Sequence, residues 1–316
     1  MNIYDVIIVG GGCAGFPAAL YTSRRSLKTL VLSKDLGGQI STASVVENYP
    51  GIDEIGGLDL ANKFKAQAEK FGTEFSFDTV EKLTKDGENF KVKTIQKEYQ
   101  AKTVILAFGK TPRNLKVPGE KEFTGKGVVY CATCDGPLFK GKDIAIIGGG
   151  NTAFSALDYM SHLANKIYLV HRNEDFKAET VLIEKAKKDK NVEFVLNSKV
   201  LEIQGKDFLE GIKVENLKEK KQSELKVQGV FVEIGFVVDA NFVQGLVDLD
   251  EFNQIIVNSK CETKTPGLFA AGDVTTTPYK QAVISAGMGA TAGLSVNSYL
   301  SAKHGKTVKN LDWGNY

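Results

Sequence analysis

Residues 128–153 combine two chemical features within one short segment and read VVYCATCDGPLFKGKDIAIIGGGNTA. The first feature is a Cys-x-x-Cys pair, Cys131 and Cys134, whose thiols can open and close a disulfide. The second is a Gly-x-Gly-x-x-Ala fingerprint that begins at Gly148, fourteen residues after the second cysteine. Such glycines let backbone amides approach a pyrophosphate at a helix N-terminus. The segment therefore predicts a nucleotide site beside a redox disulfide, and with it electron transfer from a nicotinamide to a disulfide.

The residues around this fingerprint predict a strand, a turn, a helix and a second strand. Apolar runs at 142–148 and 166–170 are typical of buried strands, and residues 151–163 show helical spacing. Gly-x-Gly-x-x-Ala between a strand and a helix is the arrangement that binds dinucleotides. Residues 142–170 are therefore expected to form a nucleotide-binding unit.

Positive residues follow the second strand of this unit, where an NAD site would usually have an acid. His171, Arg172 and Lys177 are donors suited to a 2′-phosphate. A basic surface loop is the alternative interpretation.

A second copy of the same pattern lies near the N-terminus. The apolar run 4–9 ends in a Gly-x-Gly-x-x-Gly fingerprint at Gly10, and a helix over 16–25 and a strand over 29–32 are expected after it. The two fingerprints lie 138 residues apart in matching contexts, which indicates an internal duplication. Ser33 stands where the ribose-binding acid is usually found, so a tightly held dinucleotide is favoured over a diffusible NAD.

An apolar return near the C-terminus makes the first domain discontinuous. Residues 255–257 and 265–274 predict strand structure that ends in Gly-Asp, and Asp273 lies where open α/β sheets bind ligands. The alternative for Asp273 is an N-cap of the next helix. That helix, over 283–300, is rich in Gly, Ala and Ser and suited to close packing.

The predicted fold class is α/β, with two Rossmann-like domains of three-layer ββα architecture, the second inserted in the first. Pro112 and Pro118 mark a stiff connector between them. The expected bounds are 1–114 and 244–316 for the outer domain and 115–243 for the inserted one.

Composition excludes several other classes. At 316 residues with 42% hydrophobic and 25% charged residues, the chain suits a two-domain globular protein. A net charge of +2 implies no nucleic-acid partner, and no apolar run is long enough for a membrane span. Cys13 and Cys261 extend neither a secreted disulfide framework nor a zinc set, so we expect no metal and a reducing cytosol. His162 falls within a helical pattern and is expected to be a packed or surface residue, and His304 lies in the polar tail 301–316. That tail, which contains Trp313, is either a frayed end or a segment that lies over a neighbouring surface.

With these motifs assembled, the chain resembles the low-molecular-weight thioredoxin reductases, and it is also similar to the flavoprotein subunit of alkyl hydroperoxide reductase. The resemblance extends to about residue 300. Besides the two fingerprints and His171-Arg172, the motifs that carry it are Gly37-Gly-Gln39, Glu47-Asn-Tyr-Pro50, Cys131-Ala-Thr-Cys-Asp135 and Ala270-Ala-Gly-Asp273.

The resemblance implies an outer FAD domain and an inserted NADPH domain that carries the active disulfide. The implied FAD contacts are Gly10, Gly12, Gly15, Gly37, Gly38, Gln39, Asn48, Gly109, Gly272, Asp273, Lys280, Gln281 and Ala282. The implied NADPH contacts are Gly148, Gly150, Asn151, Thr152, Ala153, His171, Arg172 and Lys177.

The catalytic residues implied are Cys131, Cys134 and Asp135. By resemblance, Cys134 faces the flavin and Cys131 attacks the substrate disulfide. Asp135 is expected to protonate the outgoing thiolate, and helix capping is the alternative. Because the nicotinamide and the dithiol must reach one flavin in turn, the inserted domain is expected to rotate on connectors near 110–118 and 235–245.

Three positions depart from the family pattern. Asn173 and Lys177 stand where the family has arginines, so NADPH is favoured and NADH stays open. Phe108 replaces a threonine and brings a bulky ring near the expected cofactor. The run 235–239 replaces the family's Gly-His-x-Pro-Asn.

The predicted function is that of an FAD-dependent thioredoxin-disulfide reductase, with a thioredoxin as partner and a homodimer as the assembly. One alternative is an NADH-linked reductase that serves a peroxiredoxin through a glutaredoxin-like carrier. Another is a slow redox-sensing flavoprotein.

Overall fold

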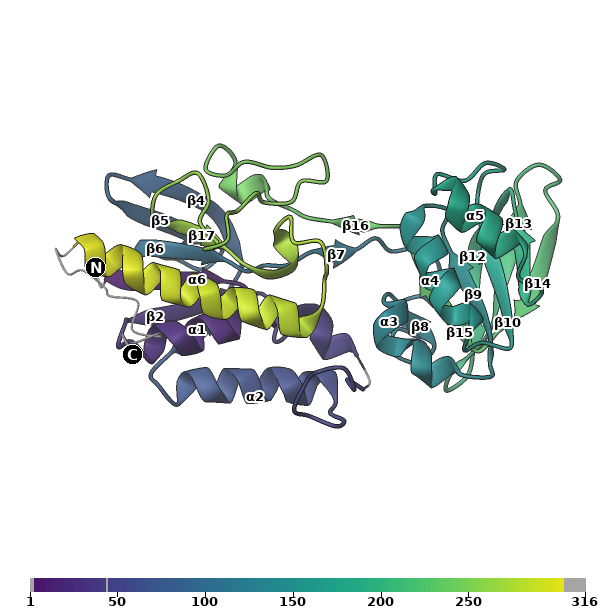
Figure 1. The fold of residues 1–316 in the computed structure, drawn as a ribbon, viewed down its shortest axis with the longest axis horizontal. Helices are drawn as coiled ribbons and strands as arrows, with labels where there is room; N and C mark the ends of the chain where they lie inside the picture. Colours follow the sequence, from purple (N-terminus) through teal and green to yellow (C-terminus); the bar gives the residue numbers. More distant parts are fainter. Residues whose placement is uncertain (1–2, 44, 304–316) are drawn as a thin grey trace, which may run out of the picture. The chain divides into compact units, whose positions relative to one another are not determined.

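The computed structural model of the chain describes residues 3–43 and 45–303. The described residues form two compact units (Figure 1). Those of unit 1 fall within Met1–Ser41, Tyr49–Thr111 and Val237–Tyr316, and those of unit 2 within Thr42–Asn48 and Pro112–Phe236. Among the described residues, no helix has the length and apolar character that crossing a membrane requires.

Unit 1 is built on a seven-stranded sheet in which five strands run parallel and two are antiparallel. The parallel strands are β1 (Ile3–Val9), β2 (Thr29–Ser33), β3 (Glu74–Phe77), β6 (Glu98–Leu106) and β17 (Leu268–Ala270), and the antiparallel ones are β4 (Val80–Asp86) and β5 (Asn89–Thr94). The order is β3-β2-β1-β6-β5-β4, and β17 pairs with the second half of β6. The carboxyl ends of β1, β6 and β17 therefore meet at one edge of the sheet.

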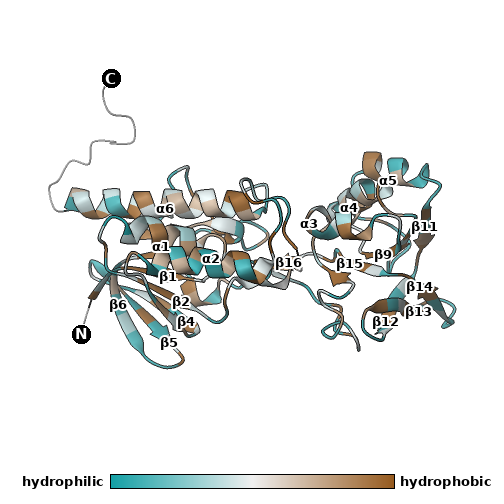
Figure 2. Cartoon of the chain, turned by 90° about the horizontal axis from the view of Figure 1, so that it is seen from below, coloured by the Kyte–Doolittle hydropathy of each residue, from teal (hydrophilic) through white to brown (hydrophobic). Residues whose placement is uncertain are grey.

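The side chains of β1 point alternately to the two faces of the sheet, and this gives unit 1 its layers. Val6 and Ile8 pack on one side with the helices, and Ile7 and Val9 pack on the other with the β4–β5 hairpin. The helices are α1 (Gly15–Ser23), α2 (Gly57–Glu69) and α6 (Ala282–Lys303). All four β1 residues are buried, and each such aliphatic side chain contributes roughly 1.5–3 kcal/mol to folding. The hydrophobic colouring of the central strands follows from this two-sided burial (Figure 2).

Helix α6 approaches α1 closely because its contact positions are small. A Cβ added at Gly289 would lie 2.1 Å from the Ala14 carbonyl oxygen, and one at Gly293 would lie 2.9 Å from the Ala18 carbonyl oxygen. The prediction of a close-packing helix at 283–300 is confirmed, with the helix running from Ala282 to Lys303.

Unit 2 repeats the architecture of unit 1. Its parallel sheet has the order β11-β10-β9-β15-β8, with β8 (Val128–Val129), β9 (Asp143–Ile147), β10 (Lys166–Val170), β11 (Val192–Val195) and β15 (Gly229–Val232). On β9, Ile144 and Ile146 pack with the helices, whereas Ala145 and Ile147 pack with an antiparallel sheet. The helices are α3 (Ala132–Asp135), α4 (Asn151–Ser161) and α5 (Thr180–Lys187), and the second sheet is β12 (Ser198–Gly205), β13 (Leu209–Asn216) and β14 (Gln222–Lys226). The predicted α/β class with two Rossmann-like layered units is confirmed.

The two connecting segments run side by side. β7 (Thr111–Pro112) pairs with β16 (Phe236–Val237), and Arg113 N donates to Gly235 O at 2.9 Å. Four short 3-10 helices complete the described elements: η1 (Gly38–Thr42), η2 (Gly136–Phe139), η3 (Asn241–Val243) and η4 (Gly272–Val274).

One local expectation differs from the structure, and one sheet lies where the sequence predicts no strands. Residues 255–257 form no named strand, because Ile255 makes only isolated bridges to Leu249 and Thr275. The β12–β13–β14 sheet was not predicted, since its exposed edge strand β14 alternates too weakly in hydropathy to signal a strand. His304 and Trp313 lie outside the described residues.

Candidate functional site

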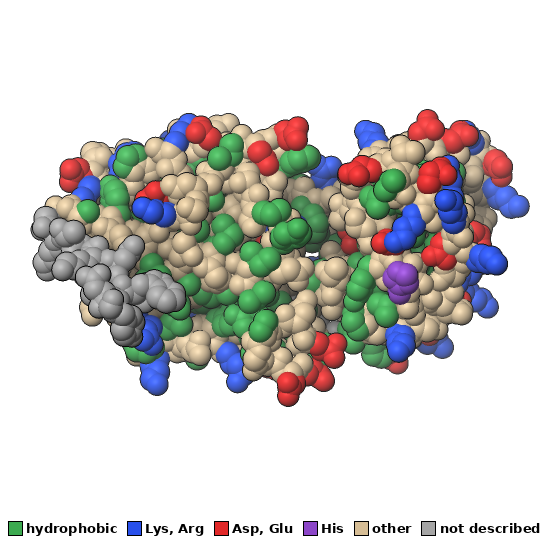
Figure 3. Space-filling view, viewed as in Figure 1, with side chains coloured by type: hydrophobic (Ala, Val, Ile, Leu, Met, Phe, Trp, Pro, Cys, Tyr) green, Lys and Arg blue, Asp and Glu red, His purple; other side chains and the backbone are tan. Residues whose placement is uncertain are grey.

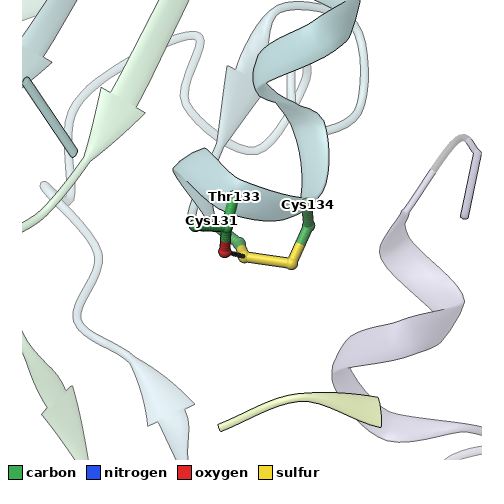
Figure 4. Close-up of a disulfide and its surroundings, with 3 residues drawn as sticks. All are labelled: Cys131, Thr133 and Cys134. Atoms are coloured by element: carbon green, nitrogen blue, oxygen red, sulfur yellow. Dashed lines mark hydrogen bonds between the residues drawn. A yellow bond between two sulfur atoms is a disulfide. The ribbon is translucent and has the colours of Figure 1, made fainter. Parts of the chain in front are cut away.

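The cysteine pair of unit 2 forms a disulfide at the start of a short helix. Cys131 occupies the N-cap position of α3 and is bonded to Cys134 with an S–S distance of 2.10 Å (Figure 4). Thr133 Oγ1 lies 3.5 Å from Cys131 Sγ. Both cysteines are half-buried. A Cys-x-x-Cys disulfide that is not fully buried can exchange with an external thiol or disulfide.

Asp135 directly follows the disulfide and is buried. The residue is 8% exposed, and burial raises the pKa of its carboxyl from 3.8 to about 6. Within the described residues, the carboxyl makes no capping hydrogen bond to η2, whose N-cap position it occupies. A carboxyl whose pKa lies this close to neutral pH can both give up and take up a proton, which suits acid–base work at the adjacent sulfurs. The capping alternative for Asp135 gains no support from this geometry.

The first glycine fingerprint forms a cradle at the carboxyl end of β1. Gly10 has φ +111°, and a Cβ there would lie 2.3 Å from the Ala107 carbonyl oxygen. A Cβ at Gly15 would lie 1.8 Å from the Gly10 carbonyl oxygen, so only glycine lets α1 begin this close to the strand. The backbone of the cradle is therefore open to a close-lying pyrophosphate, and the residues present fit a dinucleotide.

The Gly37–Gly38 loop is tied to this cradle. Gly37 N donates to Gly11 O at 2.8 Å, and Gly12 forms an isolated bridge with Gly37. Asp35 Oδ1 accepts a hydrogen bond from Gly38 N at 3.1 Å. The Asp35 carboxylate, two residues after Ser33, thus holds the loop.

Ser33 also has a structural role at the cradle. Its Oγ accepts a hydrogen bond from Gly11 N at 2.9 Å, and the residue is buried. The position that usually supplies a ribose acid here supports the fingerprint backbone instead.

Other predicted contacts of unit 1 meet at the same sheet edge. Gln39 Nε2 donates to Lys110 O at 2.6 Å, which places Gln39 beside the turn at Gly109. A Cβ at Gly272 would lie 2.7 Å from Ala14 Cβ, so the Gly272–Asp273 turn packs against the start of α1. These residues thus lie together at the carboxyl ends of the parallel strands β1, β6 and β17, as expected for a ligand site in an open α/β sheet.

Two polar side chains bond to Asp273 and its neighbours, one at the carboxylate and one at backbone carbonyls. Ser285 Oγ lies 3.0 Å from Asp273 Oδ1, and Lys280 Nζ donates to Asp273 O at 3.3 Å and to Thr275 O. Burial lowers the pKa of the Lys280 ammonium to about 8, and burial followed by the Asp273 charge raises the pKa of the Cys13 thiol to about 12. Asp273 therefore lies next to the fingerprint, whereas Asn48 falls in the Thr42–Asn48 segment grouped with unit 2.

The ring of Phe108 points into the core of unit 1. It packs edge-on against Phe242 with 4.9 Å between centroids and belongs to the cluster around Leu106 and Val243. The bulk noted at this position is therefore accommodated by an aromatic partner.

The second fingerprint, like the first, has a glycine at which a Cβ would collide with neighbouring backbone. A Cβ at Gly148 would lie 2.3 Å from the Glu233 carbonyl oxygen and 2.8 Å from Ala153 Cβ. Asn151 begins α4 and exchanges hydrogen bonds with Glu179, whose backbone N donates to Asn151 Oδ1 at 2.8 Å. The backbone fits a second dinucleotide.

His171 packs over this fingerprint. A Cβ at Gly149 would lie 2.3 Å from the His171 ring, which stacks on Phe176 with 5.3 Å between centroids. Burial, followed by the Arg172 charge, lowers the pKa of His171, so the ring is mainly neutral at neutral pH. Lys177 N donates to Gly149 O at 2.8 Å, and Arg172 and Lys177 are exposed.

One buried carboxylate near the disulfide escaped sequence reasoning. Glu120 is 5% exposed and accepts hydrogen bonds from Leu115 N and Lys116 N, both at 2.7 Å, and from Tyr130 OH at 3.1 Å. It ties the connector to the residue before Cys131. No local sequence signal marks it, since its partners become neighbours only in the fold. Among the residues described, no group of three His, Cys, Asp or Glu side chains could hold a metal ion.

Known proteins are similar to this chain in sequence and in fold. The family described as pyridine nucleotide-disulphide oxidoreductase matches residues 4–289. A thioredoxin reductase of Bacillus subtilis (strain 168) is 39% identical over 313 residues, which cover 98% of each chain.

Solved structures agree. A thioredoxin reductase from Streptococcus pyogenes MGAS5005 superposes with a TM-score of 0.91 at 37% identity, covering 95% of this chain and 99% of that one. A thioredoxin reductase from Giardia duodenalis gives a TM-score of 0.88 at 32% identity, covering 95% of this chain and all of that one (100%). The chain therefore belongs to the pyridine nucleotide-disulphide oxidoreductases, and within them to the thioredoxin reductase family.

Proposed function

We propose that the protein is a thioredoxin-disulfide reductase that moves two electrons from NADPH, through FAD and the Cys131–Cys134 disulfide, to a thioredoxin. The observation that carries the proposal is the half-buried disulfide followed directly by a buried, protonatable carboxyl, in the same unit as a glycine fingerprint. Relatives across nearly the whole chain are named thioredoxin reductase, which supports the same acceptor.

FAD is the dinucleotide proposed for unit 1. When bound, a flavin accepts hydride from a reduced nicotinamide and passes electrons to a disulfide. The flavin is needed because hydride does not transfer efficiently from a nicotinamide directly to sulfur. The cradle of Gly10, Gly12 and Gly15 would hold the pyrophosphate. Gln39 and Asp273 would offer hydrogen bonds at the carboxyl ends of the strands.

NADPH is the dinucleotide proposed for unit 2. Gly148, Gly150 and the start of α4 would hold its pyrophosphate at a helix N-terminus. Arg172 and Lys177 would attract the 2′-phosphate, since both are exposed cations in the loop after β10.

The chain's own sulfurs carry out the exchange with the acceptor. In the reduced pair, the Cys131 thiolate attacks one sulfur of the acceptor disulfide, and the acceptor's S–S bond breaks. Cys134 then attacks Cys131 in the mixed disulfide, which restores the Cys131–Cys134 bond and releases the acceptor as a dithiol. When that bond is next reduced, Asp135 supplies the proton for the departing sulfur.

Two alternatives keep the same chemistry. NADH would be the donor if the cations after β10 bind the phosphate too weakly, and a glutaredoxin-like protein would be another acceptor. A homodimer and a reducing cytosol belong to the proposal as well.

The proposal is tested by steady-state turnover of the purified protein. We expect a yellow protein that reduces a thioredoxin with NADPH faster than with NADH, and faster than it reduces a glutaredoxin. A preference for NADH or for the glutaredoxin would replace the proposed donor or acceptor. Coenzyme oxidation too slow to sustain turnover with either acceptor would favour the redox sensor.

A further inference from the structure

The loop after β10 is where unit 2 meets the ribose end of its dinucleotide, because the residues that follow the second strand of such a unit contact the 2′ position. The loop contains Arg172 and Lys177 as exposed cations, and Glu174 and Asp175 as exposed acids. His171 adds little charge, since its ring is packed on Phe176 and its pKa is lowered. Two cations offset by two acids in the same loop give a weak electrostatic site for a dianionic phosphate.

A lysine from a distant hairpin reaches this loop. The turn between β13 and β14 is ordered by Asn216, whose Oδ1 accepts hydrogen bonds from Lys218 N and Glu219 N, each at 3.0 Å. Lys220 N donates to Asn216 O at 2.8 Å. The ordered turn presents Lys218 in a defined position.

The turn is also fixed relative to the loop after β10. Leu217 N donates to Asn197 O at 2.6 Å, and Asn197 N donates to Asn173 O at 3.2 Å. Through these bonds the Lys218 ammonium contacts the Glu174 carboxylate, 44 residues away in sequence. The turn therefore delivers a third cation to the ribose end of the site.

The ion pair is one that a phosphate can displace. The two side chains are 63% and 66% exposed, and exposed pairs contribute little to stability because water screens them. A phosphate monoester carries about −1.5 to −2 charges and three acceptor oxygens, so it competes well with a single carboxylate for an ammonium group. On the face that Figure 3 shows, basic and acidic side chains are also interspersed, so the position of this pair, and not its charge alone, distinguishes it.

We propose that Lys218 is a specificity-determining residue that contacts the 2′-phosphate of NADPH, and that Glu174 competes with that phosphate for the same ammonium group. The inference rests on the proposed function. It accounts for how a loop with two cations and two acids can still favour the phosphorylated coenzyme.

The test measures direct binding to the oxidised holoenzyme, not turnover. Calorimetric titration with NADP⁺ and with NAD⁺ gives the ratio of the two dissociation constants. Lys218→Met should weaken NADP⁺ binding by roughly three- to tenfold and leave NAD⁺ binding unchanged. Glu174→Gln should tighten NADP⁺ binding by a smaller factor, and adding Lys218→Met to it should remove that gain.

Lys221→Met is the matched control, because it removes the same charge from the same turn, where Lys221 is also exposed. Equal effects of Lys218→Met and Lys221→Met would show diffuse electrostatics and overturn the role of Lys218. If Lys218→Met changed the dissociation constants of both coenzymes, or of neither, that role would be overturned too. These outcomes leave the proposed function standing, whereas a holoenzyme that binds neither dinucleotide would contradict both.

Discussion

Replacing Asp135 by Asn should slow turnover with a thioredoxin by about 10²–10⁴-fold, the contribution typical of a positioned general acid. An amide keeps the size of the side chain but cannot supply a proton. The wild-type step that uses this proton should slow as pH rises above about 6, the pKa of the buried carboxyl, and the variant should lose that dependence. Rapid-reaction measurements of disulfide reduction between pH 5 and 8 would show both effects.

The same substitution should make the folded protein more stable at pH 8. Burial raises the pKa of Asp135 from 3.8 to about 6, so folding favours the protonated form. The resulting stabilisation is fully present below 3.8 and is lost as pH rises through about 6, a difference of at most about 3 kcal/mol. Asn carries no charge and escapes this loss.

Urea midpoints measured at pH 4 and pH 8 test this expectation. The gain in midpoint for Asp135→Asn should be present at pH 8 and nearly absent at pH 4. Asp207→Asn, an exposed carboxylate in the β12–β13 turn, should change neither stability nor rate. Lost activity with no gain in stability at pH 8 would mean that burial does not raise the pKa of Asp135.

Replacing either cysteine of the disulfide should abolish electron transfer to a protein acceptor, because no other thiol can take its place. Cys261 is buried and Cys13 lies within the first fingerprint, where its pKa is raised to about 12. Cys261→Ala should therefore retain transfer and serves as the control. Coenzyme-dependent loss of flavin absorbance should persist in both disulfide variants.

The two cysteine variants should also differ from each other. Cys134→Ser leaves Cys131 free to attack, so it should accumulate a mixed disulfide with a thioredoxin, whereas Cys131→Ser should not. Non-reducing electrophoresis and mass spectrometry would identify the bond. A mixed disulfide formed mainly through Cys134 would reverse the assigned roles.

The glycine cradles were predictable because their signal is local. The positions of Gly10 and Gly148 between a strand and a helix require backbone that a Cβ would block, and the structure gives both that geometry. The layered fold was predictable for a similar reason, since strand and helix periodicities differ along the chain.

Other parts of the site depend on contacts between distant segments. His171 is predicted as a positive donor to a 2′-phosphate, and the structure packs its ring over Gly149, where burial lowers its pKa and so disfavours the charged form. The sequence names the residue type but not its burial. Glu120 and Lys218 meet their partners only after the connector and the β13–β14 turn are in place, so no spacing rule could find them.

The central claim is that electrons from the coenzyme reduce the Cys131–Cys134 disulfide to two thiols. The direct measurement is anaerobic titration of the purified protein with NADPH, followed by alkylation and mass spectrometry of every cysteine. We expect new labelling of Cys131 and Cys134 together, with Cys13 and Cys261 unchanged from the oxidised protein. Loss of flavin absorbance without new labelling of this pair, or a purified protein with no flavin at all, would contradict the account.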